Sequence, residues 1–167
     1  MNEIYIIRHA AAAELDKEIV EDSYRYLTIH GRNHCKIVAG RLKDMSVRFD
    51  LILSSPLIRA VQSAEVFASV LKYEGEIRTA MELIGGNTFS KFHQLLKRYS
   101  YFNKIAVFGH APDVNHFCTG LIKNQDIKDF TINFKNSSVC KIEYDVENDS
   151  GRLVWYLNSE NMKLIET

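Results

Sequence analysis

Four side chains in this sequence could act together on a phosphoryl group: Arg8, His9, Arg59 and His110. A guanidinium group is planar and offers a fork of N–H donors that matches phosphate oxygens. An imidazole ring can donate hydrogen bonds from its nitrogens to the same oxygens. Two arginines and two histidines in one place would therefore form a dense site for a dianionic phosphoryl group.

Each of these side chains follows a short apolar run that is typical of a buried strand. The three runs are Glu3 to Ile7, Phe49 to Leu53 and Lys104 to Phe108. Functional groups in open α/β sheets gather beyond the carboxyl ends of the strands. The pattern therefore predicts that the three strand ends face one crevice. Helices that begin near Arg59 and after His110 would direct the positive ends of their dipoles at the same anion.

The segments between these runs carry apolar residues at helical spacing. We expect four helices, over residues 29–45, 57–71, 88–99 and 112–121. We also expect a loop over 10–28, a short strand within 77–83, a polar loop over 123–136 and hairpin strands over 138–144 and 152–157. This order predicts a single α/β domain over residues 1–167, a three-layer α/β/α sandwich with a mainly parallel central sheet and an antiparallel edge strand.

Composition excludes several functions. The chain has 21 basic and 21 acidic residues among 167, so the basic excess of a nucleic-acid-binding protein is missing. The apolar runs are too short for a signal peptide or a membrane span, and we expect a cytoplasmic protein that binds neither membrane nor nucleic acid. Cys35, Cys118 and Cys140 are far apart and odd in number, which favours reduced thiols over a disulfide framework or a zinc site.

Four motifs of this chain resemble those of one known family. They are Ile7-Arg8-His9-Ala10, Leu27-Thr28-x-x-Gly31, the segment Ser54 to Ala64 with its Ser-Pro-x-x-Arg-Ala-x-Gln-Ser pattern, and Phe108-Gly109-His110-Ala111-Pro112. They resemble, in the same order, the motifs of the histidine phosphatase superfamily, also called phosphoglycerate mutase-like. The resemblance covers residues 3 to about 120, and its nearest branch is that of the compact phosphohistidine phosphatases of the SixA type.

The resemblance implies a role for each candidate residue and no metal or other cofactor. His9 would be the nucleophile, Arg8 and Arg59 would hold the phosphoryl oxygens, and His110 would donate a hydrogen bond to the same group, most effectively if it is cationic. Larger relatives use a carboxylic acid to protonate the leaving oxygen. Glu82 is the candidate for that acid here, with an ordinary surface glutamate as the alternative.

The chain departs from the family where Ala10 replaces a glycine, which would be a point of strain if the position needs a positive φ. Only about forty residues separate Arg59 from Lys104, which leaves little chain for a lid. An open site favours phosphohistidine in a protein as substrate, with inorganic phosphate as product. The alternatives are a phosphatase of small phosphate esters and a catalytically silent module that binds phosphate or a partner.

Overall fold

The computed structural model describes residues 1–122 and 132–166. Most of the polar loop predicted over 123–136 lies outside the described residues. Within them, seven strands form one sheet in the order β3-β2-β4-β1-β5-β6-β7. The strands are β1 (Asn2–Arg8), β2 (Leu51–Ser54), β3 (Ile77–Thr79), β4 (Lys104–Gly109), β5 (Val139–Asp145), β6 (Ser150–Asn158) and β7 (Lys163–Glu166).

The sheet has a parallel half and an antiparallel half. Strands β3, β2, β4 and β1 run parallel to one another, and β5, β6 and β7 each pair antiparallel with the preceding strand of the order. The predicted layered α/β fold is thus confirmed, but its antiparallel part is larger than one edge strand. β7 was not predicted, because its four residues, with half-buried Leu164 and Ile165 at the centre, give no clear alternation.

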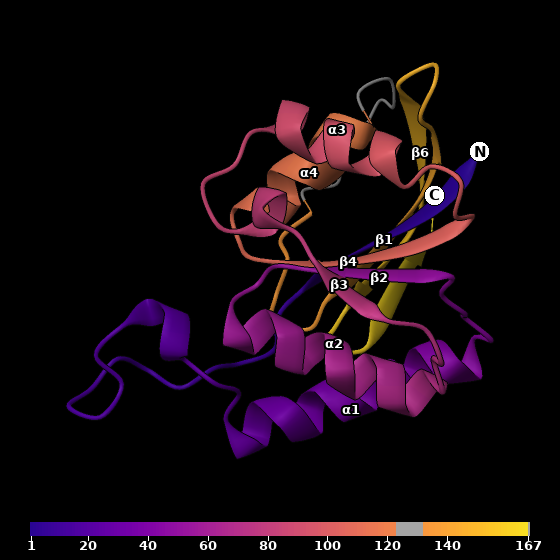
Figure 1. Cartoon of the computed structure of the whole chain (residues 1–167). Helices are drawn as coiled ribbons and strands as arrows, with labels where there is room; N and C mark the ends of the chain where they lie inside the picture. Colours follow the sequence, from indigo (N-terminus) through magenta and orange to yellow (C-terminus); the bar gives the residue numbers. More distant parts are fainter. Residues whose placement is uncertain (123–131, 167) are drawn as a thin grey trace.

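Helices cover both faces of the sheet. α1 (Ile29–Asp44) and α2 (Ile58–Leu71) lie on one face, and α3 (Phe89–Arg98) and α4 (Asp113–Leu121) lie on the other (Figure 1). Side chains of β1 alternate between the two cores: Ile4 and Ile6 pack toward α3 and α4, while Tyr5 and Ile7 pack toward α1 and α2. This double burial explains why the strand reads as a continuous apolar run.

Threonine side chains cap the first turns of two helices. The Thr28 hydroxyl accepts a hydrogen bond from the Gly31 N–H at 2.9 Å, at the start of α1. The Thr88 hydroxyl accepts one from the Lys91 N–H at the start of α3. Pro112, the first residue of the predicted helix 112–121, is the N-cap residue of α4, which begins at Asp113. Each predicted helix is therefore found within a residue or two of its expected ends.

The chain between β1 and α1 leaves the body of the molecule. It contains the short 3-10 helix η1 (Asp22–Tyr24), and an isolated bridge between Ala12 and Leu27 closes its base. Figure 1 shows this segment, in indigo, projecting away from the sheet. The helices of the described residues are all too short or too polar to cross a lipid bilayer.

Candidate active site

The three predicted strand ends meet. β4 lies between β1 and β2 in the sheet, and all three are parallel, so Arg8, Ser54 and Gly109 end neighbouring strands at the same edge. A pocket of about 320 Å³ opens there. The side chains of Arg8, His9, Arg59 and His110 line it together, as the sequence predicted.

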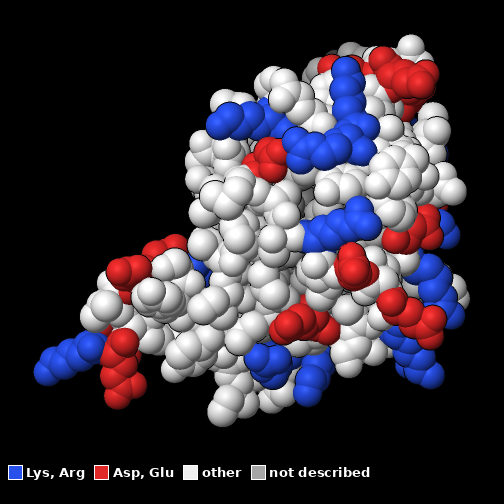
Figure 2. Space-filling model, viewed as in Figure 1, with Lys and Arg blue, Asp and Glu red and all other residues white. Residues whose placement is uncertain are grey.

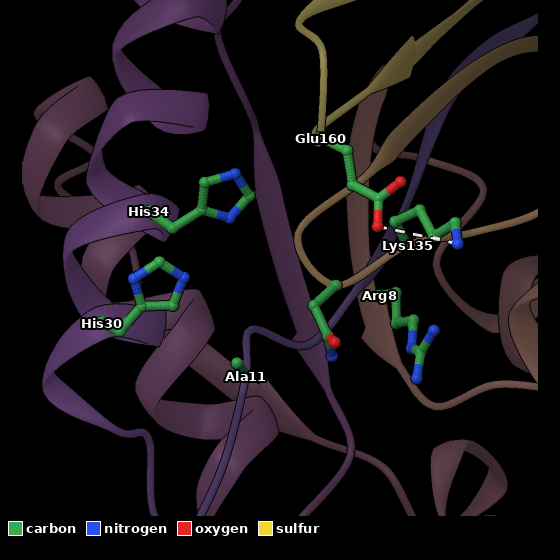
Figure 3. Close-up of a pocket in the computed structure, with 7 residues that line it drawn as sticks. Arg8, Ala11, His30, His34, Lys135 and Glu160 are labelled. Carbon is green, nitrogen blue, oxygen red and sulfur yellow. Dashed lines mark ion pairs between the residues drawn. The ribbon is translucent and has the colours of Figure 1, made fainter.

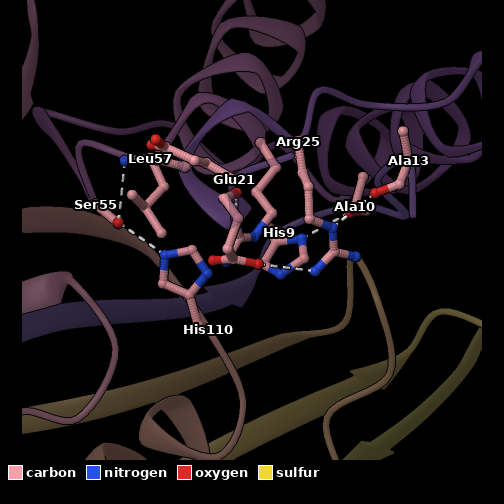
Figure 4. Close-up of polar contacts among 11 residues, drawn as sticks. His9, Ala10, Ala13, Glu21, Arg25, Ser55, Leu57 and His110 are labelled. Carbon is pink, nitrogen blue, oxygen red and sulfur yellow. Dashed lines mark hydrogen bonds and ion pairs between the residues drawn. The ribbon is translucent and has the colours of Figure 1, made fainter. Parts of the chain in front are cut away.

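His9 is held in a form suited to nucleophilic attack. Its side chain is only 8% exposed, and its Nδ1 lies 2.7 Å from the Ala10 carbonyl oxygen (Figure 4). A carbonyl only accepts, so Nδ1 carries the proton and Nε2 keeps its lone pair. Burial lowers the pKa of His9 to about 4, and the charges of Arg59 and Arg8 act in the same direction. The ring is therefore neutral at neutral pH.

Ala10 is not a point of strain. Among the described residues, the non-glycine positions with positive φ do not include it. Its N–H donates to the Ser63 hydroxyl oxygen at 2.9 Å, and that hydroxyl donates to the Arg59 carbonyl oxygen at 2.7 Å. Ser63 thus ties the backbone beside His9 to the first turn of α2, the turn that carries Arg59.

Both arginines are fixed by the protein and keep donors for a ligand. Nη1 of Arg8 donates to the Phe134 carbonyl at 2.7 Å. Nη1 and Nη2 of Arg59 donate to the carbonyl and the carboxylate of Asp22, each at 2.8 Å. Among the described residues, the buried Nε atoms of Arg8 and Arg59 have no hydrogen-bond partner. Unpaired buried donors are rare in folded proteins, and a bound anion is one group that can complete them.

His110 faces His9 across the pocket, with 5.0 Å between the ring centroids. Its Nε2 lies 2.7 Å from the Ser55 hydroxyl, and its other ring nitrogen points away from Ser55 (Figure 4). That nitrogen, Nδ1, is buried without a partner in the described part of the chain. If the Ser55 hydroxyl donates to Nε2, Nδ1 carries the proton and can donate to a bound group.

The charge of His110 depends on what the pocket holds. Burial, together with the neighbouring His9 and Arg59, lowers its pKa to about 3. Asp22 acts in the opposite direction but does not offset these effects, so the ring is neutral at neutral pH. A dianion close to the ring would raise its pKa, so a cationic His110, as the sequence analysis preferred, would depend on a bound phosphoryl group.

Sequence reasoning missed three further residues of the pocket: Glu14, Arg25 and Asn136. The Asn136 amide donates to the His9 carbonyl at 3.0 Å, and Arg25 Nε donates to the Ala13 carbonyl at 2.6 Å. All three lie in loops, where no periodic pattern shows which way a side chain points. Only the closeness of Arg25 to the Leu27-Thr28 motif could have drawn attention to it.

Glu82 is not among the residues of this pocket. It lies in the 3-10 helix η2 (Met81–Leu83) and lines a separate hollow with Met81 and Lys91. Its carboxylate accepts a hydrogen bond from Arg98 Nη2 at 3.0 Å. The structure therefore favours the alternative reading, a glutamate in a surface ion pair. Glu14 is the carboxylate that lines the pocket of His9.

A second pocket adjoins the first and shares Arg8, Ala11 and Asn136 with it. His30 and His34, one turn apart on α1, stack with nearly parallel rings on one side of it (Figure 3). Lys135 and Glu160 form an ion pair on the opposite side. Over residues 1–122 and 132–166, no three histidine, cysteine or acidic side chains gather in a way that could hold a metal ion.

Known proteins resemble this chain in sequence and in fold. The family model of the histidine phosphatase superfamily (branch 1) matches residues 4–85. An uncharacterized protein of Picosynechococcus sp. is 31% identical over 125 residues, which span 74% of each chain. The phosphohistidine phosphatase SixA of Escherichia coli is 26% identical over 165 residues, or 97% of each chain. A structure of the protein histidine phosphatase SixA complexed with tungstate superposes with a TM-score of 0.85 at 25% identity, covering 96% of this chain and 99% of the other.

Proposed function

The chain belongs to the histidine phosphatase superfamily, and from this we propose that it removes the phosphoryl group from phosphohistidine in a protein, through a covalent phosphohistidine intermediate on His9. The chain is a phosphatase by its family and by its similarity to SixA. The substrate and the covalent step are the proposal.

One observation carries it: the hydrogen bond from His9 Nδ1 to the Ala10 carbonyl. This bond fixes the tautomer, so the lone pair of Nε2 is available to attack phosphorus. The low pKa of His9 keeps that lone pair unprotonated at neutral pH. Attack forms the bond from Nε2 to phosphorus and breaks the bond from phosphorus to the substrate's ring nitrogen, and the substrate leaves as a neutral imidazole whose other ring nitrogen carries the proton. Water then attacks the same phosphorus and releases inorganic phosphate and free His9.

The neighbours of His9 would stabilise the charge on the transferred group. The free Nε donors of Arg8 and Arg59 and the Nδ1 of His110 are buried polar groups that a phosphoryl group can satisfy. Phosphoryl transfer depends chiefly on such positioning and charge stabilisation. A substrate imidazole leaves from nitrogen more readily than an unprotonated alkoxide leaves from oxygen, so the reaction needs no strong general acid. This agrees with the position of Glu82 outside the pocket.

A phosphoenzyme trap tests the proposal. Wild-type protein, His9→Ala and the matched histidine control His34→Ala are mixed with a peptide that carries radiolabelled phosphohistidine, and the reaction is quenched in alkali. We expect base-stable, acid-labile label on the wild type and on His34→Ala, and none on His9→Ala. Turnover that survives in His9→Ala would refute the covalent step. A wild type that hydrolyses a small phosphate ester but not the peptide would refute the substrate class.

A further inference from the structure

The segment that projects between β1 and α1 exposes large apolar side chains. In this projecting segment, residues 13–28, Leu15 is 54% exposed, Val20 71%, Tyr24 57% and Tyr26 49%. Side chains of this size are costly to leave in water, and a concentration of them next to a functional site is typical of a surface that binds another molecule. Their number in so short a segment separates this region from the rest of the described surface.

The projecting segment is continuous with the active-site pocket. Glu14 and Arg25, both in the segment, line the pocket together with His9. Asp22 holds Arg59 through two hydrogen bonds and Arg25 through a third, at 3.1 Å. A phosphoryl group that reaches His9 therefore passes beside this segment. Whatever carries that group comes into contact with the exposed apolar side chains if it is large enough.

The charge of the projecting segment restricts its partner. Five acidic residues, Glu14, Asp16, Glu18, Glu21 and Asp22, stand against two basic ones, Lys17 and Arg25. Figure 2 shows the projecting lobe with acidic groups on both sides of uncharged surface. This arrangement attracts a partner with apolar residues at the centre of contact and basic residues around them. It repels small molecules that carry several negative charges.

We propose that the projecting segment is the docking surface for the protein substrate, which presents its phosphohistidine beside apolar and basic residues. This rests on the proposed function and adds to it the kind of protein surface that is recognised. A small phosphate ester fits the pocket without reaching Leu15 or Val20. The projecting segment would therefore raise the affinity of the enzyme for protein substrates and leave its affinity for small phosphate esters unchanged.

Two synthetic peptides of equal length test the docking surface. Each carries one central phosphohistidine, with leucine and arginine neighbours in the first and glycine and glutamate neighbours in the second. The enzymes are the wild type, the double variant Leu15→Ser/Val20→Ser and the control Ile37→Ser, which removes an equally exposed apolar side chain from α1. Hydrolysis of p-nitrophenyl phosphate by each enzyme reports the intact catalytic pocket.

We expect wild-type kcat/KM to be about tenfold higher for the first peptide than for the second, since burial of two such side chains is worth more than the 1.4 kcal/mol of a tenfold change. The double variant should lose most of this preference, and Ile37→Ser should keep it, with p-nitrophenyl phosphate hydrolysed equally by all three. Equal wild-type rates on the two peptides, or an unchanged preference in the double variant, would overturn the docking surface and leave the proposed function intact. Failure of the wild type on both peptides, with p-nitrophenyl phosphate hydrolysed, would overturn the proposed function and the docking surface together.

Discussion

Asp22 holds Arg59 at both terminal nitrogens, with its carboxylate on Nη2 and its carbonyl on Nη1, each at 2.8 Å. The carboxylate of Asp22 thus already binds Arg59, one of the two arginines that line the pocket. Although burial acts to raise it, hydrogen bonds from Arg59 and Arg25 hold the pKa of Asp22 below its ordinary value. Asp22 is therefore charged at neutral pH and opposes a second anion at Arg59.

Neutralising Asp22 should strengthen phosphate binding. We expect Asp22→Asn to lower the inhibition constant of inorganic phosphate by a factor of about 1.4 to 5, since a half-exposed ion pair is worth about 0.2–1 kcal/mol. The measurement is competitive inhibition of p-nitrophenyl phosphate hydrolysis. Glu18→Gln is the matched control, because it removes the same charge from the same segment and should change the constant little. A constant that rises in Asp22→Asn would show that Asp22 helps rather than opposes the bound anion.

The two buried histidines should make stability depend on pH. Burial lowers the pKa of His9 to about 4 and that of His110 to about 3, below the value of about 6.5 for an unfolded histidine. Below pH 6.5 the unfolded chain binds more protons than the folded one, so stability is full above this pH and is lost as the pH falls. For His9 the loss is about 3 kcal/mol once the pH reaches its folded pKa.

Urea unfolding in phosphate-free buffer measures this effect. The free energy of unfolding should fall between neutral pH and about pH 4, and the double variant His9→Asn/His110→Asn should show a much smaller fall over that range. Equal pH dependence in both proteins would mean that other groups cause the loss.

Gly31 and Gly40 form a matched pair on α1. A Cβ added at Gly31 would clash with the Ala11 carbonyl oxygen, whereas a Cβ at Gly40 meets nothing within 4 Å. Gly31→Ala should therefore displace the backbone after His9, destabilise the protein by about 2 kcal/mol and reduce turnover. Gly40→Ala should stabilise it by up to about 1 kcal/mol. Thermal unfolding and kcat check both, and a Gly31→Ala enzyme with unchanged kcat would contradict the expected displacement.

Replacing Glu14 and replacing Glu82 should affect kcat differently on substrates whose leaving group must be protonated. Glu14 lines the pocket and Glu82 does not. With an alkyl phosphate ester as substrate, we expect Glu14→Gln to reduce kcat about tenfold or more, because an alkoxide needs protonation to leave. Glu82→Gln should stay within about twofold of the wild type. With a phosphohistidine peptide, both variants should keep most of their activity. The reverse order on the ester would restore Glu82 as the candidate acid.

The sequence alone predicted the layers and the convergence of the strand ends, because both follow from strong local patterns. Buried strands such as Glu3 to Ile7 are continuous apolar runs, and the helices carry apolar residues at regular spacing. The positions of Arg8, Arg59 and His110 follow from the strands that precede them. The prediction for Ala10 remained open until its φ was known, because residue type does not determine a backbone angle.

The parts that were missed depend on tertiary contacts. Arg25 and Asn136 reach the pocket from loops, so only the folded chain shows their direction. Glu82 was chosen because it follows a predicted strand, but β3 is an edge strand separated from β1 by β2 and β4, and Glu82 does not line the pocket of His9. The position of Glu82 outside the pocket follows from the order of the strands in the sheet, which the sequence does not reveal directly.

The place of β4 in the sheet also determines when the pocket can form during synthesis. Residues 1–59 already contain Arg8, His9 and Arg59, yet β1 and β2 do not pair with each other and are joined only through β4. A nascent chain therefore carries His9 and both arginines before it can bring them together. The pocket that they line is assembled only when residues 104–110 have left the ribosome and entered the sheet, so an intact pocket reports that the parallel half of the sheet is complete.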